Sequence, residues 1–467
     1  MIEFYYENFK KNYKKKVEDL TKDIEILLAY EGIKIQKANN NIVDSIYKSN
    51  LSNEAWNKVN DLYFTLELEK ANISTTLDKF RQKDNRKINK KNRKLFIDTF
   101  AGCGGLSQGL IQAGLEPILV NEIEPRFLET YYFNHKLDIK SYFCGDIKML
   151  VDGPILDDPK YYETDLVVGG PPCQGFSMAN RQRILDDPRN ELYKQFLKLL
   201  GRVRPKFFIM ENVKGMMKKS GEIIENFESI LGEEYSIRML LLNAKNYGVP
   251  QNRERVFVIG TRLQYVDIDI VIDEIKTHKY TNRQYFLKDA LLGLPEIHPK
   301  REKNKIKDEN DKTGIKFRLV KQDNKNDFTE FLGGHIDYIS NHVNRYNNER
   351  DIEIFSRLPQ GANSLHPSIE DIMPYRSRNH MFKDKYYKLK EDDVCKTITS
   401  HMKFDCNMYI HPKQARGLSP REAARVQTFP DDYIFMGAQN LWYAQIGNAV
   451  PVKLAQAIGE IITKYIK

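Results

Sequence analysis

Cysteine is scarce in this chain, and its placement excludes two common ways of stabilising a fold. There are five cysteines among 467 residues, an odd number, and no two of them form a Cys-x-x-Cys pair. A disulfide framework and a structural zinc site are therefore disfavoured. We expect a reducing compartment, no bound metal and a fold held by its own hydrophobic core.

Long apolar runs are absent as well. No stretch approaches the roughly 20 apolar residues that a membrane helix needs, and residues 1–4 do not begin a basic and then apolar leader. We therefore expect a cytoplasmic protein and neither a membrane protein nor a secreted one. Hydrophobic residues still make up 41% of the chain, enough for a large core, which excludes wholesale disorder.

Acidic residues are outnumbered by basic ones, 64 to 73, and the excess is uneven. Residues 81–94 hold eight basic side chains and one acid, Asp84. Such a run suits a solvated linker, and it also suits contact with phosphate. The basic excess permits a nucleic-acid partner without establishing one.

Residues 1–82 carry apolar side chains at spacings of three and four, which predict a helical hairpin or a short coiled coil. Two such runs, beginning at Tyr13 and Trp56, flank the turn-like Asn-Asn-Asn at 39–41. A DNA-binding helix-turn-helix is the alternative. We expect the basic linker 83–94 to join this extension to the rest, and the extension to mediate self-association or contact with a protein partner.

The sequence pattern changes at residue 95, where short runs rich in β-forming residues begin to alternate with segments long enough to form helices. This alternation predicts a parallel, doubly wound α/β sheet over residues 95–264. Region 265–412 loses the rhythm, is polar and contains turn signals, so we predict a separate insertion domain. Helical pattern resumes in 413–467, which we expect to return to the first domain. The predicted strands are 95–98, 118–120, 165–168, 207–210, 237–242 and 256–259, with helices near 105–114, 125–134, 190–202 and 221–232.

A glycine-rich turn, Phe-Ala-Gly-Cys-Gly-Gly at 100–105, follows the first predicted strand and opens a helix. Glycines there let the backbone approach a ligand and aim free N–H groups at it. A dinucleotide fingerprint would need a third glycine where Ser107 stands, so a nicotinamide cofactor is disfavoured. Glu122, after the second strand, can hold ribose hydroxyls, and Asp146 can accept from an exocyclic amine. Their order after the turn favours a nucleoside pocket.

Cys173 lies in Gly-Gly-Pro-Pro-Cys-Gln-Gly-Phe-Ser at 169–177, just past a predicted strand. Prolines and glycines fix its backbone and keep bulk away, a setting that suits a nucleophile. Glu211 ends the next strand and is the expected proton donor to the electrophile. Arg253 and Arg255 follow in Gln-Asn-Arg-Glu-Arg, where strand alternation would put both on one face for anion contacts.

Six motifs follow one another in the regions 95–264 and 393–467. The motifs are Phe-Ala-Gly-Cys-Gly-Gly at 100–105, Gly-Pro-Pro-Cys at 170–173, Glu-Asn-Val at 211–213, Gln-Asn-Arg-Glu-Arg at 251–255, the stretch 416–430, and Gln-Ile-Gly-Asn-Ala-Val-Pro at 445–451. With these motifs in this order, the chain resembles the cytosine-5 DNA methyltransferase family, of the restriction–modification type.

The resemblance implies a Rossmann-like methyltransferase sheet, a smaller target-recognition domain at 265–412, and S-adenosylmethionine as cofactor. Glu122 would hold its ribose, Asp146 its adenine, and Asn448 and Val450 its amino-acid end. The family often has an aromatic residue after the ribose acid, where this chain has Ile123, so adenine stacking should be weaker there. The cofactor-binding residues implied in full are Asp98, Phe100, Gly102, Gly104, Glu122, Asp146, Ile147, Pro171, Asn448 and Val450.

The implied reaction is methylation of cytosine carbon 5 in double-stranded DNA. Cys173 would attack carbon 6 of a flipped-out base while Glu211 protonates nitrogen 3, and Arg255, supported by Arg253, would contact the carbonyl oxygen. The enzyme would act as a monomer on DNA, in a bacterium or phage, and would protect DNA from a restriction enzyme. The DNA-contacting residues implied are Gln174, Ser177, Gln251, Arg376, Arg378, Lys383 and Thr397.

Two other functions remain open at this point. A tRNA cytosine-5 methyltransferase shares the fold, but it normally carries a Cys-Phe-Thr element that is absent here and has a shorter recognition domain. A DNA-binding regulator would instead rely on residues 1–94, and the intact set of Cys173, Glu211 and Arg255 argues against it.

We predict that exchanging residues 265–412 for the matching segment of a relative moves the methylated sequence with the segment. Deleting residues 1–82 should leave that sequence unchanged, because the deletion lies outside the motif-bearing regions. Bisulfite sequencing of DNA from cells expressing each variant measures both effects. A pattern that changes on deletion but not on exchange would assign specificity to the N-terminal helices.

Overall fold

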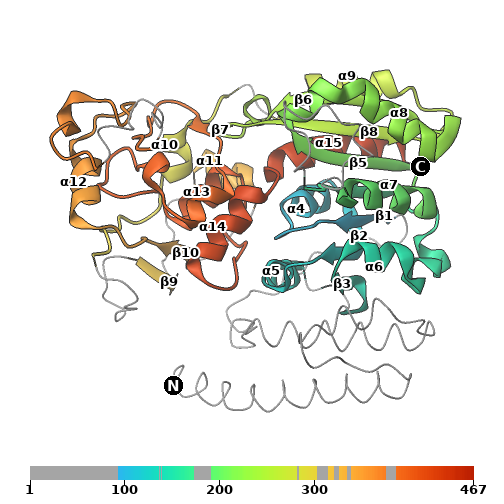
Figure 1. The fold of residues 1–467 in the computed structure, drawn as a ribbon, viewed down its shortest axis with the longest axis horizontal. Helices are drawn as coiled ribbons and strands as arrows, with labels where there is room; N and C mark the ends of the chain where they lie inside the picture. The colour runs from blue at the N-terminus through green and yellow to red at the C-terminus, as the bar shows by residue number, and fades with distance from the viewer. Residues whose placement is uncertain are drawn as a thin grey trace, which may run out of the picture. The chain divides into compact units, whose positions relative to one another are not determined.

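The computed structural model describes most of the chain from Arg93 onward (Figure 1). The predicted N-terminal helices, most of the basic linker and Cys173 lie outside the described residues. These are 93–135, 137, 139–172, 191–280, 283–301, 314–319, 326–333, 338–374 and 385–466.

The described residues form two compact units. The first holds those up to Leu242, Glu254–His278 and the end of the chain from Gln456, and the second holds Asn243–Arg253 and Lys279–Ala455. These bounds differ from the predicted domains, because the first unit also holds 265–278 and the second holds 243–253 and 413–455. The alternation of strands and helices in the sequence ends near residue 264, although the first unit continues to His278. A boundary placed where the alternation ends therefore comes too early in the chain.

A seven-stranded sheet in the order β3-β2-β1-β4-β5-β8-β6 forms the centre of the first unit. Neighbours from β3 to β5 pair in parallel, and β8 runs antiparallel to β5. The predicted α/β sheet is therefore confirmed, with one reversed strand and with β3, which was not predicted. The strands are β1 Lys94–Thr99, β2 Leu115–Glu122, β3 Tyr142–Cys144, β4 Leu166–Gly169, β5 Phe207–Val213, β6 Ser236–Asn243 and β8 Glu254–Thr261.

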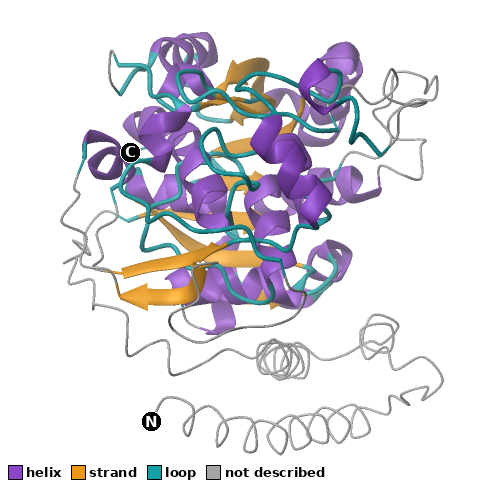
Figure 2. Cartoon of the chain, turned by 90° about the vertical axis from the view of Figure 1, so that its left-hand side faces the viewer, coloured by secondary structure: helices purple, strands orange, loops and turns teal. Residues whose placement is uncertain are grey.

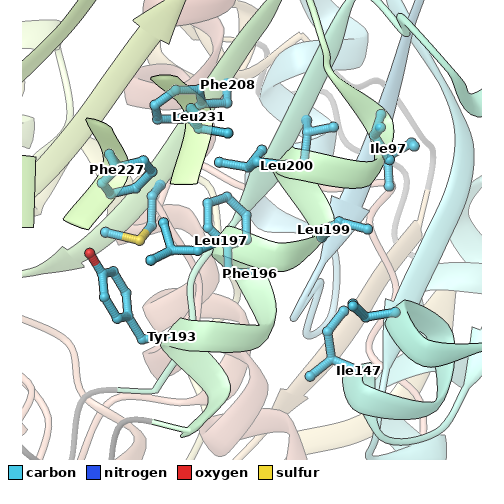
Figure 3. Close-up of a cluster of buried hydrophobic side chains, with 14 of the residues drawn as sticks. Ile97, Ile147, Tyr193, Phe196, Leu197, Leu199, Leu200, Phe208, Phe227 and Leu231 are labelled. Carbon is cyan, nitrogen blue, oxygen red and sulfur yellow. The ribbon is translucent and has the colours of Figure 1, made fainter. Parts of the chain in front are cut away.

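Helices cover both faces of this sheet because its strands are apolar on both sides. On β2, Leu119 belongs to a large core formed with α6, α7 and α8, whereas the adjacent Val120 belongs to a smaller core with α5. Figure 3 shows side chains of α7 among those of the larger core, where Phe208 stacks on Phe227 at 4.9 Å between ring centroids. The helices are α4 Gly105–Gln112, α5 Pro125–His135, α6 Ile147–Asp152, α7 Glu191–Val203, α8 Ser220–Leu231, α9 Ile268–Thr277 and α15 Val452–Tyr465, the last of which enters the first unit at Gln456.

The second unit contains short helices and two small strand pairs, shown by type in Figure 2. β9 and β10 are antiparallel, while β7 and β11 are parallel. No described helix in either unit is long and apolar enough to cross a membrane. The elements of this unit are β7 Gln251–Asn252, α10 Leu287–Leu291, β9 Gly314–Leu319, α11 Asp327–Leu332, β10 Tyr338–Val343, α12 Glu349–Arg357, β11 Cys395–Lys396, α13 Pro420–Val426 and α14 Gln439–Asn448.

Buried arginines hold the second unit together around α13. Ser419 and Glu422 form a capping box at its start, and Glu422 also accepts two hydrogen bonds from Arg416, at 2.7 and 2.6 Å. Arg425 makes a similar bidentate pair with Asp431, at 2.8 and 2.7 Å. Burial alone would raise the pKa of Glu422, but the Arg416 guanidinium holds it well below its usual range. The arginines of motif 416–430 therefore serve the fold.

We expect Glu422→Gln to destabilise the second unit by about 3–5 kcal/mol, because it leaves Arg416 buried without its opposite charge. Urea denaturation measures the loss. Asp269→Asn is the matched control, since it removes the partner of an exposed arginine, Arg238, and should change stability little. Equal effects of the two substitutions would contradict a stabilising role of the buried pair.

Candidate active site

The turn between β1 and α4 has the geometry that its glycines allow. Gly102 and Gly104 have positive φ angles of 57° and 89°, and Phe100 shares this left-handed region at 56°. The Ala101 N–H donates to the Asn121 carbonyl at 3.0 Å, which ties the turn to β2. A Cβ added at Gly102 would meet no atom within 4 Å, so one side of the turn is open to a ligand.

Glu122, at the end of β2, is held against this turn. One carboxylate oxygen accepts from the Gly102 N–H at 2.8 Å and the other from the Glu124 N–H at 2.9 Å. Burial raises the pKa of Glu122, and the backbone donors oppose that shift. The next residue, Ile123, is 66% exposed. The carboxylate is therefore fixed beside the open glycine.

Asp146 lies beyond the end of β3 and caps α6. Its carboxylate accepts from the Lys148 N–H at 2.8 Å, and Ile147 beside it is buried. The Asn121 amide donates to the Gly145 carbonyl at 2.8 Å, which joins the ends of β2 and β3. The carboxyl ends of three neighbouring strands thus bring Gly102, Glu122 and Asp146 to one edge of the sheet.

Asp98 differs from the other acids because it is almost fully buried. Its carboxylate accepts from the Ser107 hydroxyl at 2.5 Å, which in turn accepts from the Tyr131 hydroxyl at 2.7 Å. Burial raises the pKa of Asp98 to about 7, with the Ser107 hydrogen bond opposing the shift. Sequence reasoning did not predict this chain of hydroxyls, although Ser107 was visible where a third glycine would stand.

The ends of β4 and β5 form the second part of the site. Gly169 pairs with Met210 across the two parallel strands, and the Asn212 amide donates to the Pro171 carbonyl at 3.1 Å. A Cβ at Gly170 would lie 3.2 Å from a carboxylate oxygen of Glu211. Glu211 therefore lies against the glycine that comes three residues before Cys173. Cys173, Gln174 and Ser177 themselves lie outside the described residues.

Arg255 forms an ion pair with Glu211. Its Nε lies 3.0 Å from a Glu211 oxygen, and the two side chains are 16% and 15% exposed. Register explains the contact: Glu211 is opposite Phe257 and Val213 is opposite Arg255, so the pair is diagonal on one face. The sequence predicted both residues, and the pairing of β5 with β8 brings them together.

Arg253 does not share a strand with Arg255, so that prediction is wrong. β8 begins at Glu254, and Arg253 belongs to the second unit. It is 1% exposed and donates to the carbonyls of Ile398, Gly447 and Ala449, at 2.6, 3.2 and 2.9 Å. Its guanidinium donates to backbone carbonyl groups. This arrangement does not fit the predicted role, in which Arg253 supports the contact of Arg255 with a carbonyl oxygen of the base.

Gln251 likewise does not fit its predicted contact with DNA. It is 0% exposed, its amide nitrogen donates to Gln427 at 2.7 Å, and its oxygen accepts from the Ile398 N–H at 2.7 Å. Thr397 stays partly exposed, and its hydroxyl donates to the Asn252 carbonyl at 2.7 Å.

The remaining predicted residues divide between the second unit and the undescribed segments. Asn448 ends α14, and Val450 is 6% exposed two residues later. Arg376, Arg378 and Lys383 lie outside the described residues, so their contact with DNA stays a prediction.

The chain is similar to known DNA methyltransferases. The family model described as C-5 cytosine-specific DNA methylase matches residues 94–464. The type II methyltransferase M.DdeI of Desulfomicrobium norvegicum is 33% identical over 396 residues, which cover 79% of this chain and 88% of that protein. M1.HphI of Haemophilus parahaemolyticus is 31% identical over 379 residues, which cover 79% and 86%. A prophage-encoded E. coli protein described as a DNA modification methyltransferase has a solved structure with a TM-score of 0.61, 27% identity, and coverage of 79% and 98%.

We predict that Ser107→Ala destabilises the first unit by about 1–3 kcal/mol, because a buried carboxylate loses a hydrogen-bond donor. The loss should be larger at pH 8 than at pH 6. Since the pKa of Asp98 in the fold is about 7, the charged form, which the Ser107 hydroxyl stabilises, prevails only above it.

Thermal denaturation at both pH values measures this difference. Ser229→Ala is the control, because it removes an exposed hydroxyl that donates to the Asn226 carbonyl. A loss that does not vary with pH would show that the Ser107 hydroxyl does not act through Asp98.

Proposed function

Because the chain belongs to the family of C-5 cytosine-specific DNA methylases, we propose that it methylates a cytosine flipped out of duplex DNA through a covalent bond to Cys173. It is a DNA (cytosine-5-)-methyltransferase of the restriction–modification type. The covalent step, the flipping of the base and the protection of DNA from a restriction enzyme are the parts that we propose.

The observation that supports the covalent step most is the position of Glu211. Its carboxylate lies against Gly170 and is paired with Arg255 at 3.0 Å, at the end of a strand adjacent to β4. Chain connectivity puts Cys173 three residues beyond Gly170. A nucleophile and a proton donor at neighbouring strand ends are what an attack on an electron-poor ring carbon requires.

The end of the sheet at β1, β2 and β3 fits an adenosyl-bearing donor such as S-adenosylmethionine. Gly102 is open on one side, so a ligand can approach the backbone there. The fixed carboxylate of Glu122 can accept from ribose hydroxyls, and that of Asp146, partly buried, from an exocyclic amine. When bound, S-adenosylmethionine supplies a methyl group on a positively charged sulfur.

The reaction on the base begins when the Cys173 thiolate forms a bond to carbon 6 of cytosine. Glu211, in its protonated form, donates its proton to nitrogen 3, which takes up the electron pair displaced by the addition and leaves an enamine whose carbon 5 is nucleophilic. Carbon 5 would then take the methyl group, whose bond to the positively charged sulfur of the donor would break and leave that sulfur as a neutral thioether. Loss of the carbon 5 proton to solvent breaks the sulfur–carbon 6 bond and restores the thiolate, while nitrogen 3 returns its proton to Glu211.

Arg255 has two functions in this proposal. Its ion pair orients the Glu211 carboxylate, and its remaining N–H groups can donate to the carbonyl oxygen of the base. The flipped base costs a few kcal/mol of stacking and pairing, which contacts to the DNA must offset. Transfer to tRNA is the weaker alternative, because the matching family model is that of DNA methylases.

We expect Cys173→Ser to abolish methyl transfer while binding of S-adenosylmethionine persists, because the serine alkoxide is far scarcer at neutral pH. DNA that carries 5-fluorocytosine at the target should trap the wild-type enzyme covalently. Release of Cys173 requires loss of the proton on carbon 5, and the fluorine that replaces this proton cannot leave in the same way. A gel shift that survives denaturation detects the trapped complex. Trapping that persists in Cys173→Ala would reject the assignment.

Glu211→Gln should lower turnover by about 10²- to 10⁴-fold, the usual share of a general acid. The amide can still hydrogen-bond nitrogen 3 but cannot supply a proton. Transfer of labelled methyl groups to DNA measures the loss, with Glu254→Gln, one residue before Arg255, as a neighbouring control. Near-normal turnover of Glu211→Gln would mean that another group protonates the ring.

A further inference from the structure

A large aromatic side chain is exposed seven residues after Thr397. Phe404 is 62% exposed and directly follows the 3-10 turn Ser400–Lys403. Lys403 lies over its ring, with Nζ 4.8 Å from the centroid, and the His401 ring meets it edge-on with centroids 5.2 Å apart. An apolar ring in water is thus accompanied by two side chains that can carry positive charge.

The backbone that presents Phe404 is firmly anchored. Met402 is fully buried and its carbonyl accepts from Arg345 at 2.8 Å, while the Phe404 N–H donates to the His401 carbonyl at 2.9 Å. A Cβ added at Gly447 would lie 2.2 Å from the Ser400 nitrogen, so α14 presses directly on this turn. The exposure of Phe404 is therefore built into the turn and does not come from a fraying end.

The charges around the turn also favour a polyanionic partner. Lys396 lies over the rings of Tyr387 and Tyr409, at 5.0 and 5.8 Å from their centroids. The acid next to Phe404, Asp405, accepts from the Asn407 N–H at 3.1 Å and so turns toward the backbone. Residues 396–404 therefore carry Lys396, Lys403 and His401 beside Phe404, with no acidic residue in this stretch.

We propose that Phe404, Lys403 and His401 form a contact surface for duplex DNA. This inference rests on the proposed function, and it adds a site that the six motifs and the implied DNA contacts Arg376, Arg378 and Lys383 did not identify. Lys403 pairs with a backbone phosphate, and the ring of Phe404 packs against the adjacent sugar. His401 supports the ring and reaches the same backbone.

A protein partner fits this surface less well than DNA does. The centres of protein interfaces are depleted of lysine, whereas here a lysine lies directly over the exposed ring. A lysine held over a ring has lost part of its side-chain freedom before binding, so its contact with phosphate costs less conformational entropy. An aromatic ring beside a pre-positioned cation suits the sugar and the phosphate of a DNA backbone.

The test uses the full-length protein and a short, mixed-sequence duplex labelled with fluorescein, with binding followed by fluorescence anisotropy. Phe404→Ala should weaken binding by about tenfold, because the apolar contact of the ring with the sugar is lost. Phe404→Trp should keep an affinity close to that of the wild type, because an aromatic ring is retained. Lys403→Ala should reduce the slope of log affinity against log salt by about one, as for one lost phosphate contact.

Leu365→Ala is the matched control, because Leu365 is also a large apolar side chain of the second unit, 49% exposed. It should leave duplex binding unchanged. Phe404→Ala should also raise KM for DNA about tenfold with kcat and the affinity for S-adenosylmethionine little changed, which a general loss of folding would not do.

The outcomes separate this inference from the proposed function. Unchanged duplex binding of Phe404→Ala, or an effect as large in Leu365→Ala, would overturn the contact surface. A change in oligomeric state on Phe404→Ala with unchanged DNA binding would also overturn it, in favour of a protein interface. Duplex binding that depends on Phe404 in a protein that forms no 5-methylcytosine would support the surface and reject the proposed reaction.

Discussion

The close approach of β4 to its neighbours at Gly169 and Gly170 is the constraint on which the catalytic end of the sheet depends. A Cβ at Gly169 would lie 2.5 Å from the Thr99 hydroxyl and 2.8 Å from the Phe196 ring, so any side chain would push β4 away from β1 and α7. The space at Gly170 is occupied by the Glu211 carboxylate instead. Two glycines thus set the separation between the end of β4 and the group proposed to protonate the base.

The same sheet explains why the acids of the first unit differ in character. Glu122 and Asp146 follow strand ends and are held by backbone N–H groups, which orient a carboxylate and leave further lone pairs for a ligand. Asp98 lies one position inside β1 and is enclosed by Ser107 and Tyr131. Ser107 lies on α4 and Tyr131 on α5, so these hydrogen bonds join β1 to both helices.

In the second unit, charged residues of the motifs act within the protein. Arg253 bonds three carbonyls, Arg416 pairs with Glu422, and Arg425 pairs with Asp431. Each guanidinium is buried, and burial without these partners would cost several kcal/mol. Residues that a motif marks can thus be required for the fold alone, whereas Phe404 and Lys403 lie outside the motifs and face solvent.

The sequence by itself determined the α/β class and the strands of the central sheet other than β3, because alternation and glycine-rich turns are local patterns. It also determined Glu211 and Arg255 as partners in one site, through motifs whose order implies the family. Only the tertiary structure decided that Arg253 and Gln251 are buried, that Asp98 faces Ser107 and Tyr131, and that Phe404 is exposed. Burial depends on which segments far apart in the chain pack together, and the packing of Ile398, Gln427 and Gly447 around motif 251–255 has no signature in the local order of residues.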